Sequence, residues 1–190
     1  MNSTSEVFEI ELWQSTDTRL DRDLHSLGDL LHDCVHAGAA VSFILPFSRE
    51  EAAAFWRDKV LPAVQDETCR VVVARRNGEI VGTVQVDLAT PPNQPHRGEI
   101  KKLLVHPSAR RAGVARALML AIEEQARNAR RTLLTLDTAS AAAEHLYASL
   151  GYVRVGVIPR FSLRADAPEA PEFEGTTVMY KELSPAPRNP

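Results

Sequence analysis

The chain has 190 residues, of which 44% are hydrophobic and 25% are charged, and its formal net charge is −3. This length and composition fit one globular domain with an ordinary core, and they argue against global disorder. The slightly negative charge argues against nucleic-acid binding, because proteins that bind the phosphate backbone are usually basic.

The opening stretch MNSTSEVFEIELW is acidic and lacks the apolar core of a signal peptide. No apolar run approaches the roughly 20 residues that a membrane span needs. The two cysteines, Cys34 and Cys69, show no metal-binding spacing and are too few for a disulfide framework. We therefore expect a soluble cytoplasmic protein that binds neither membrane nor nucleic acid. Both a monomer and a homodimer remain open.

The first half of the chain predicts one strand, two helices and a hairpin. Alternating apolar residues over Phe8–Leu12 indicate a strand, and a leucine stripe indicates a helix over about Arg19–Val35. The stretch HAGAAVSFILPFS lacks a helical period and predicts a loop. Ser48-Arg-Glu-Glu51 then matches a capping box that opens a second helix. Two β-branched runs around Asn77-Gly78 predict a tight hairpin, the clearest local signal in the chain.

The second half alternates strands and helices after the proline-rich loop TPPNQPHRG. In order, we expect a strand at Glu99–Val105, a helix with its apolar stripe from Val114 to Ile122, a strand at Leu133–Leu136, a helix at Ser140–Leu150, and strands at Tyr152–Ile158 and Thr177–Leu183 joined by a loop containing RADAPEAPEFEG. The order β-α-α-β-β-β-α-β-α-β-β implies a mixed sheet covered by helices. We expect residues 1–183 to form a single domain and residues 184–190 to form a disordered tail.

The segment HPSARRAGVARALMLAIEE has the features of an anion-binding site. A strand breaks at Pro107, and a helix begins near Ala112, with Gly113 in its first turn. The first amides of a helix lack intrahelical partners and carry about half a positive charge, so phosphates bind there readily. Gly113 permits close backbone approach, and Ala115 adds little bulk. Three arginines add positive charge: Arg110, Arg111 and Arg116.

This segment is neither a P-loop, which ends in Gly-Lys-Ser/Thr, nor the dinucleotide fingerprint G-x-G-x-x-G. On its own it is equally compatible with an arginine-rich turn that caps an ordinary helix.

Two linked motifs carry a family resemblance. Arg110-x-x-Gly113-x-Ala115, after the strand EIKKLLVHP, resembles the pyrophosphate-binding motif of the GNAT superfamily, the acetyl-CoA-dependent N-acetyltransferases. Ala143-x-x-Leu-Tyr147-x-x-x-Gly-Tyr152 resembles the second signature of that family. The resemblance covers about residues 7–183. It implies an α/β fold of the GNAT type, with a central mixed sheet and helices on both faces, and acetyl-CoA as cosubstrate with no metal.

The resemblance also implies a set of cofactor-binding residues: Leu103, Leu104, Val105, Arg110, Arg111, Ala112, Gly113, Val114, Ala115, Arg116 and Ser140. In the family the two strands that flank the cofactor splay apart, so the amides of Leu103 and Val105 can pair with pantetheine. An N–H near Leu103 is the expected oxyanion donor. Ser140 replaces the usual cofactor-binding asparagine, so it either contacts the cofactor or only caps the following helix.

The acceptor amine requires a base. An amine with a pKa of about 10.4 is almost fully protonated at neutral pH, so the site must remove a proton before attack. Glu99 stands where several family members carry a catalytic glutamate, and it is the candidate base, directly or through a water. The alternative for Glu99 is a solvated charge at a strand edge.

Tyr147 is the candidate acid of the family for the departing thiolate. Reference pKa values of about 10 for tyrosine and 8.5 for a thiol make complete proton transfer uphill by about 2 kcal/mol. Tyr147 therefore acts as a hydrogen-bond donor as much as a general acid. The alternative is a tyrosine that only packs in the core. The six histidines form no H-E-x-x-H motif, and we expect His106 to be a surface residue.

Asp137 ends the strand LLTLD and, with Glu99, would place two carboxylates at the substrate cleft, which favours a small cationic amine. The alternative is an aspartate that caps the next helix. The chain is also similar to the tabtoxin-resistance subfamily, which acetylates an amino-acid-like antimetabolite. Four segments carry this similarity: LLHDCVHAGAAVSFILPF, GEIKKLLVHPSARRAG, LLTLDTAS and YVRVGVIP. We therefore expect an N-acetyltransferase for the primary amine of a small molecule, such as an antimetabolite or antibiotic. The alternatives are an acetyltransferase for protein N-termini or lysines and a non-catalytic acyl-CoA-binding module.

Overall fold

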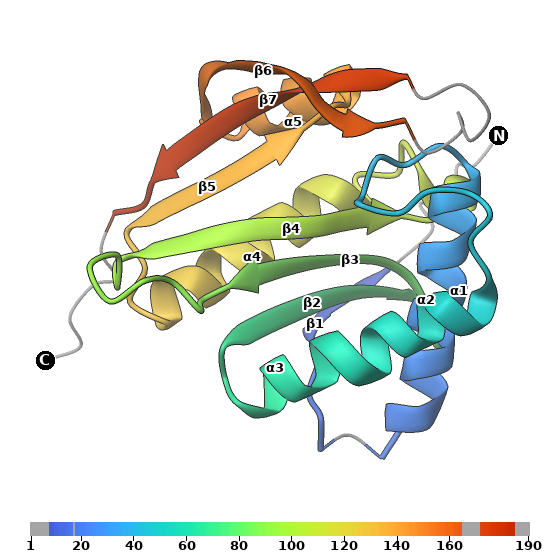
Figure 1. The fold of residues 1–190 in the computed structure, drawn as a ribbon. Coiled ribbons are helices and arrows are strands. Elements are labelled where there is room, and N and C mark those ends of the chain that lie inside the picture. The colour runs from blue at the N-terminus through green and yellow to red at the C-terminus, as the bar shows by residue number, and fades with distance from the viewer. Residues whose placement is uncertain (1–7, 17, 165–171, 185–190) are drawn as a thin grey trace, which may run out of the picture.

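The computed structural model describes residues 8–16, 18–164 and 172–184, and its centre is one mixed sheet (Figure 1). The sheet has seven strands in the order β1-β2-β3-β4-β5-β7-β6. Their bounds are β1 Glu9–Leu12, β2 Cys69–Arg76, β3 Glu79–Asp87, β4 Arg97–Val105, β5 Leu133–Thr138, β6 Val153–Leu163 and β7 Phe173–Glu182. Only β4 and β5 pair in parallel, and every other neighbouring pair is antiparallel.

Helices cover both faces of the sheet, as predicted. The helices are α1 Leu20–His36, α2 Arg49–Phe55, α3 Leu61–Gln65, α4 Val114–Asn128 and α5 Ala141–Ser149. Figure 1 shows α2 and α3 in front of the sheet and α4 and α5 behind it. Strand β2 is buried on both faces: Val71 and Val73 pack against the α1 side, and Val72 packs against the α4 side. Because successive side chains of a strand point to opposite faces, the centre of β2 is a continuous apolar run, Val71–Ala74.

Local chemistry accounts for the elements that were predicted best. The Ser48 side chain accepts a hydrogen bond from the Glu51 amide at 3.2 Å, and the Glu51 carboxylate accepts one from the Ser48 amide at 2.8 Å, which completes the predicted capping box. Asn77 and Gly78 both have positive φ, as the predicted hairpin between β2 and β3 requires. The helix predicted over residues 19–35 is observed one residue later at each end.

Strand β4 contains a bulge that reverses its two faces. Thr83 of β3 lies opposite Leu104, but Gln85 lies opposite Lys101, so β4 has one extra residue in this interval. Lys102, within the bulge, has a φ of +53°. As a result Ile100 packs into the core on the α4 side, whereas Leu104 packs into the core on the α1 side.

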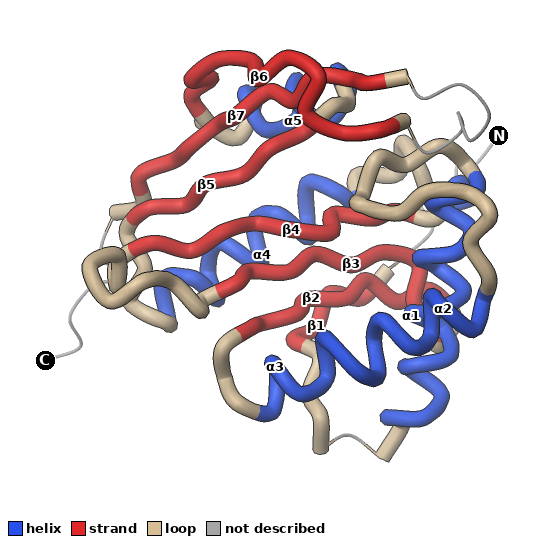
Figure 2. Tube along the Cα trace, in the orientation of Figure 1, coloured by secondary structure: helices blue, strands red, loops and turns tan. Residues whose placement is uncertain are grey.

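Beyond the start of β4, the sheet opens. Strands β4 and β5 pair only over Arg97–Glu99 and Leu133–Thr135. The remainder of β4 continues beside β3, while β5 follows β7. The backbone of β4 after Glu99 therefore faces a gap in the ladder rather than another strand. Figure 2 shows that the loop between α1 and α2 lies beside the distal end of β4.

The predicted bounds of the last two strands were wrong. The strands at 152–158 and 177–183 are longer, and Phe173, Glu174 and Gly175 belong to β7 rather than to a loop, because the ladder with β6 continues to the pair Leu163 and Phe173. This part of the hairpin is largely exposed and lacks the buried alternation that identifies a strand. The second helix is divided into α2, a π-helical turn at Trp56–Val60, and α3.

Parts of two predictions fall beyond the described residues. Residues 165–171 of the predicted β6–β7 loop lie outside them, as do residues 185–190 of the predicted tail. Within the described part of the chain, no helix combines the length and apolarity needed to span a membrane.

Candidate active site

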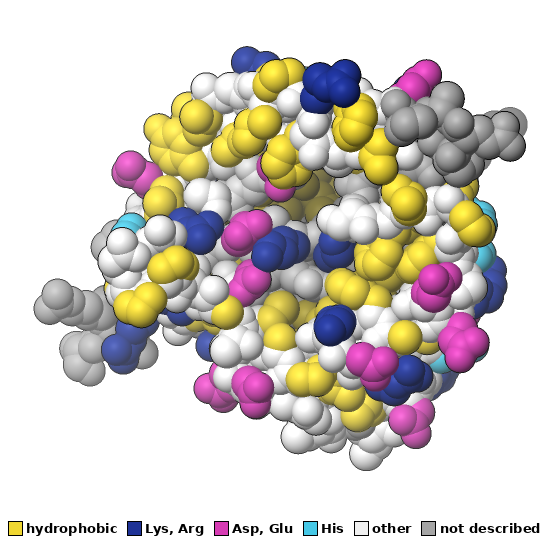
Figure 3. Space-filling model, in the orientation of Figure 1, with side chains coloured by type: hydrophobic (Ala, Val, Ile, Leu, Met, Phe, Trp, Pro, Cys, Tyr) yellow, Lys and Arg dark blue, Asp and Glu magenta, His cyan; other side chains and the backbone are white. Residues whose placement is uncertain are grey.

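A cleft opens where β4 and β5 separate. Its cavity has a volume of about 800 Å³ and is lined by both strands, the start of α5 and the loop after α1. Figure 3 shows this face of the molecule, hollowed near its centre where acidic and basic side chains meet. The cavity brings together residues that are far apart in the sequence, among them Glu99, Asp137 and Tyr147.

The predicted phosphate loop lies at one end of this cleft. After β4, a short 3-10 turn at Pro107–Ala109 leads to Gly113, the N-cap residue of α4, which has a φ of +83°. No side chain hydrogen-bonds to the first amides of α4, and a Cβ added to Gly113 would meet nothing within 4 Å. A 15-residue helix thus begins with free amides that face open space, and this geometry fits a pyrophosphate.

The predicted cofactor-binding residues fall into two groups. Six of them line the cavity: Leu103, Leu104, Val105, Arg110, Ala115 and Ser140. The other five are not part of its lining: Arg111, Ala112, Gly113, Val114 and Arg116. The side chain of Val114 is buried in the core, so only its backbone can face a ligand. The Arg116 guanidinium donates to Ser149 Oγ at 2.6 Å and so joins α4 to α5. The Arg110 side chain donates to the Val105 carbonyl at 3.3 Å, which holds it beside the end of β4.

Ser140 lies where it can fill both roles that the sequence left open, as the cap of α5 and as a contact for the cofactor. Its Oγ accepts a hydrogen bond from the Ala143 amide at 3.3 Å and caps α5. The same residue lines the cavity. The capping role is therefore present in the structure, and contact with a cofactor remains sterically open.

Tyr147 lies in the wall of the cavity with only 5% of its surface exposed. Its ring centroid is 5.7 Å from that of Tyr152. Burial raises the pKa of the Tyr147 phenol to about 12, and the charge of Asp137 adds to this effect. The phenol therefore keeps its proton throughout the neutral range and can donate a hydrogen bond.

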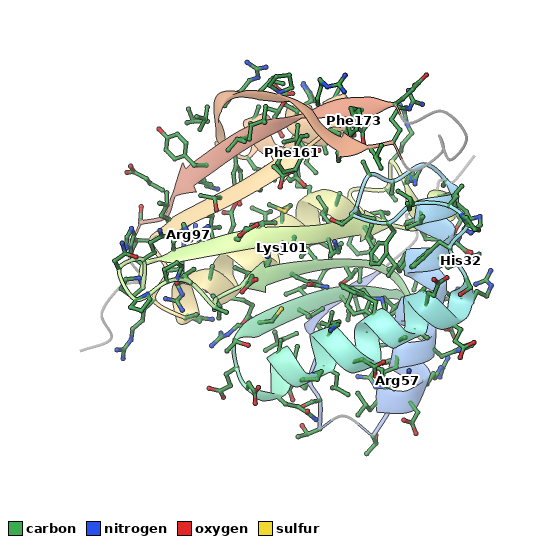
Figure 4. All side chains as sticks on the ribbon, viewed as in Figure 1. His32, Arg57, Arg97, Lys101, Phe161 and Phe173 are labelled. Carbon is green, nitrogen blue, oxygen red and sulfur yellow. The ribbon has the colours of Figure 1, made fainter. Side chains whose placement is uncertain are left out.

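Glu99 lines the cavity between two cations of its own strand, and its side chain is 36% exposed. Its carboxylate lies 3.6 Å from the Arg97 guanidinium and 3.7 Å from Lys101 Nζ. Lys101 Nζ also donates to the Asp87 carboxylate at 2.8 Å. Figure 4 labels Arg97 and Lys101 along β4.

Asp137 shares a face of the sheet with Glu99. Glu99 lies opposite Thr135 in the β4–β5 pair, and Asp137 follows two residues later on the same side of β5. The Asp137 carboxylate accepts a hydrogen bond from Thr176 Oγ1 of β7 at 2.7 Å. The cap of α5 is Ser140, so the alternative capping role of Asp137 is absent from the structure.

Lys102 was missed at the sequence level. Its Nζ donates to the Val41 carbonyl at 2.8 Å and lies 5.3 Å and 5.7 Å from the ring centroids of Phe43 and Phe55. Burial, with a smaller contribution from the neighbouring charge of Lys101, lowers the pKa of Lys102 to about 8. The side chain ties the loop after α1 to the bulge of β4. The run Lys101-Lys102 alone does not indicate which lysine lies against the loop. The bulge of β4 decides this, and the bulge depends on pairing with β3.

Two further cavity residues, Phe161 of β6 and Glu174 of β7, were also missed. Glu174 was assigned to a loop, and Phe161 lay beyond the predicted end of its strand. Among the predicted surface residues, His106 caps the 3-10 turn through its ring nitrogen. In the described ranges, no three His, Cys, Asp or Glu side chains come together as a metal-binding group.

Comparison with known proteins identifies the family to which this chain belongs. The acetyltransferase (GNAT) family profile matches residues 11–152. An N-acetyltransferase of Azospirillum brasilense from the hisH–hisA intergenic region, described as uncharacterised, is 33% identical over 123 residues, which are 64% of this chain and 71% of that protein.

Solved structures with similar folds include the putative acetyltransferase yncA of Salmonella typhimurium with its cofactor acetyl-CoA. It is 17% identical, with a TM-score of 0.73 over 93% of this chain and 94% of that chain. The ribosomal-protein-alanine N-acetyltransferase of Brucella melitensis is 22% identical, with a TM-score of 0.74 over 92% of this chain and 99% of that chain. With the matched profile, the splayed β4–β5 pair and the open start of α4, the chain belongs to the GNAT family of acetyltransferases.

Proposed function

We propose that this protein transfers an acetyl group from acetyl-CoA to the primary amine of a small molecule by direct attack of the amine. The observation that carries the proposal is the cleft itself. One end presents the free amides of α4, and the middle brings Glu99, Asp137 and Tyr147 together. The chain belongs to an acetyltransferase family, and this membership supports the proposal. A similar fold has been solved with acetyl-CoA, which supports it as well.

The cofactor end fits a pyrophosphate and an extended pantetheine arm. The amides at the start of α4 would hold the pyrophosphate, with Arg110 beside them. The unpaired edge of β4 at Leu103–Val105 would receive pantetheine in the manner of an added strand. When bound, acetyl-CoA supplies an activated thioester, so the remaining difficulty lies with the amine.

Glu99 and Asp137 prepare the amine. Two carboxylates on one face of the cleft favour the entry of an ammonium group. We assign proton removal to Glu99, directly or through a water, because it lines the cavity on the strand that leads to the phosphate loop. The new N–C bond forms as the C–S bond breaks, and the sulfur leaves with the electron pair of that bond.

Tyr147 serves the departing sulfur. With a phenol pKa of about 12 and a thiol pKa of about 8.5, complete proton transfer is uphill by about 5 kcal/mol. This cost exceeds the roughly 2 kcal/mol that the reference pKa values give. We therefore assign Tyr147 the role of a hydrogen-bond donor that stabilises the thiolate. Cys34 also lines the cavity, but burial raises its pKa to about 11, which argues against an acetylated cysteine on the pathway.

A small acceptor suits the enclosure of the cleft. The loop residues Ala37–Ser42 line the acceptor side of the cavity, and Lys102 holds this loop against β4. A peptide acceptor would need that loop to move aside. The similarity to a ribosomal-protein-alanine N-acetyltransferase, at 22% identity, concerns the fold.

The test is acetyl transfer across a panel of primary amines and a peptide with a free N-terminal alanine. Thiol release and the mass of the product are measured together for the wild type and for Glu99→Gln. We expect acetylated small amines, with kcat/KM for the best of them at least roughly tenfold above that for the peptide, and a lower kcat in the variant. Acetylation of the peptide alone, or thiol release without an acetylated product, would overturn the proposal.

A further inference from the structure

A second cavity continues the cleft toward the β6–β7 hairpin. Its volume is about 260 Å³. Both cavities share the same wall, formed by Ala40, Ser42, Asp137, Ala139, Phe161 and Glu174. The space therefore extends the acceptor side of the active site and is distinct from the end that receives the cofactor.

Two carboxylates in the shared wall form no ion pair among the described residues, although Asp137 is near enough for its charge to partly oppose the lowering of the Lys102 pKa. Asp137 lies opposite Val178 in the β5–β7 ladder, and side-chain alternation places Thr176 and Glu174 on the same face as Val178. The hydrogen bond from Thr176 to Asp137 agrees with this placement. Among the described residues, neither Asp137 nor Glu174 forms an ion pair with a lysine, an arginine or a histidine, although Glu174 is only partly exposed.

Apolar side chains complete the second cavity. They come from the loop after α1 and from β6: Phe43, Ile44, Phe161 and Leu163. Phe161 is 53% exposed, which is high for a phenylalanine and leaves its ring available to a ligand. Figure 4 labels Phe161 on the hairpin beside the cleft. Aromatic faces attract cations as well as hydrocarbon.

The described lining of the second cavity offers no cationic side chain that could pair with a carboxylate of the acceptor. No lysine, arginine or histidine is found among the described residues that line the second cavity. Among the cations that line the first cavity, Lys101 pairs with Asp87, whereas Lys102 and Arg110 donate to the Val41 and Val105 carbonyls, which do not neutralise their charge. An α-carboxylate that entered the second cavity would lose water beside two like charges, with no cation in the described lining of that cavity to pair with.

We propose that the second cavity binds the remote end of the acceptor and that the acceptor is a diamine or polyamine without a carboxylate. One amine reacts near Glu99 and Tyr147. A second ammonium group lies between Asp137 and Glu174, and the hydrocarbon between the two amines lies against Phe161. This assignment rests on the proposed acetyl transfer to a small amine, and it argues against an amino-acid-like acceptor.

The test compares three acceptors of matched chain length: 1,4-diaminobutane, ornithine, which adds a carboxylate, and butylamine, which lacks the second cation. We expect kcat/KM for diaminobutane to exceed both others by roughly tenfold or more, since one charge-assisted contact contributes about 1.4 kcal/mol or more. Glu174→Gln should lower kcat/KM for diaminobutane by a similar factor, mainly through KM, and should lower that for butylamine much less. Glu172→Gln is the matched control on the same hairpin, because Glu172 pairs with Arg164 and does not line either cavity.

Two results would overturn the inference: turnover of ornithine that equals or exceeds that of diaminobutane, or an equal effect of Glu174→Gln on diaminobutane and butylamine. If none of the acceptors is acetylated, the proposed function fails, and calorimetry on coenzyme A-loaded protein decides the cavity separately. Binding of diaminobutane that Glu174→Gln weakens would support the second cavity, and absence of binding would overturn it.

Discussion

The two ends of the cleft are built in different ways. The cofactor end comes from one continuous segment, the distal part of β4 and the start of α4, and it presents mainly backbone amides. The acceptor end comes from four segments: the loop after α1, the end of β5, and the two strands of the β6–β7 hairpin. It presents side chains. A backbone site serves one invariant ligand, whereas side chains can change between family members without altering the fold.

This difference separates the expected effects of mutation. Changes at the cofactor end should affect binding of acetyl-CoA for every acceptor. Changes at the acceptor end should alter the choice of amine and leave acetyl-CoA binding intact. Three substitutions test this division, beginning with the largest expected effect, and a fourth tests how Lys102 contributes to stability.

Gly113→Glu should weaken acetyl-CoA binding by roughly 100-fold or more, equal to about 2.7 kcal/mol, because a carboxylate would occupy the open space in front of the α4 amides. Calorimetry measures the effect. Gly113→Ala controls for backbone strain at the positive φ, and Gly78→Glu places the same acid at a comparable φ in the hairpin turn. Normal binding by Gly113→Glu would remove the pyrophosphate from this helix.

Tyr147→Phe should lower kcat by roughly 100-fold with little change in KM for acetyl-CoA, because its hydrogen bond to sulfur strengthens as negative charge develops. Steady-state kinetics, with a single-turnover measurement to show that chemistry limits the rate, provide the check. Tyr152→Phe is the matched control, since Tyr152 is buried beside Tyr147 but is absent from the cavity wall. Unchanged kcat in Tyr147→Phe under chemistry-limited conditions would exclude the role.

Asp137→Asn should lower kcat/KM for the amine by roughly tenfold and leave the melting temperature nearly unchanged. Asparagine retains an oxygen that can accept the hydrogen bond from Thr176, but it carries no charge. Amine kinetics and a thermal melt on the same preparation separate the two effects. Unaltered amine kinetics would make Asp137 a structural residue.

Lys102→Met should change how stability depends on pH. The folded-state pKa of Lys102 is about 8, below the ordinary lysine value of 10.5, so between these values the unfolded chain binds more protons. The free energy of unfolding of the wild type should therefore rise, relative to that of the variant, as pH increases from 8 to 10.5. The expected relative change is on the order of 1 kcal/mol, discounted for partial solvent access.

Denaturant unfolding at pH 7.5 and pH 10 measures this change. Lys101→Met is the control: burial lowers the Lys101 pKa, but its hydrogen bond to Asp87 and the charges of Glu99 and Asp87 outweigh that effect and raise it. Its contribution should have the opposite sign. A pH-independent difference between wild type and Lys102→Met would show that Lys102 is freely solvated.

The same contrast explains what the sequence could predict. The phosphate loop, the capping box at Ser48 and the Asn77-Gly78 turn depend on residues close together in the chain, so local patterns identify them. The position of Lys102 depends on a bulge set by pairing with β3. Glu174 was placed in a loop because the first residues of its strand, Phe173, Glu174 and Gly175, are not buried and show no alternation. The acceptor end was therefore the part that required a structure.

A crystal structure of the protein with coenzyme A and 1,4-diaminobutane tests the division of the cleft most directly. The account predicts pyrophosphate oxygens against the amides at the start of α4, pantetheine along Leu103–Val105, and a reacting amine near Glu99 and Tyr147, with the second ammonium between Asp137 and Glu174. Pyrophosphate bound away from the α4 amides, or the diamine bound outside the two joined cavities, would contradict it.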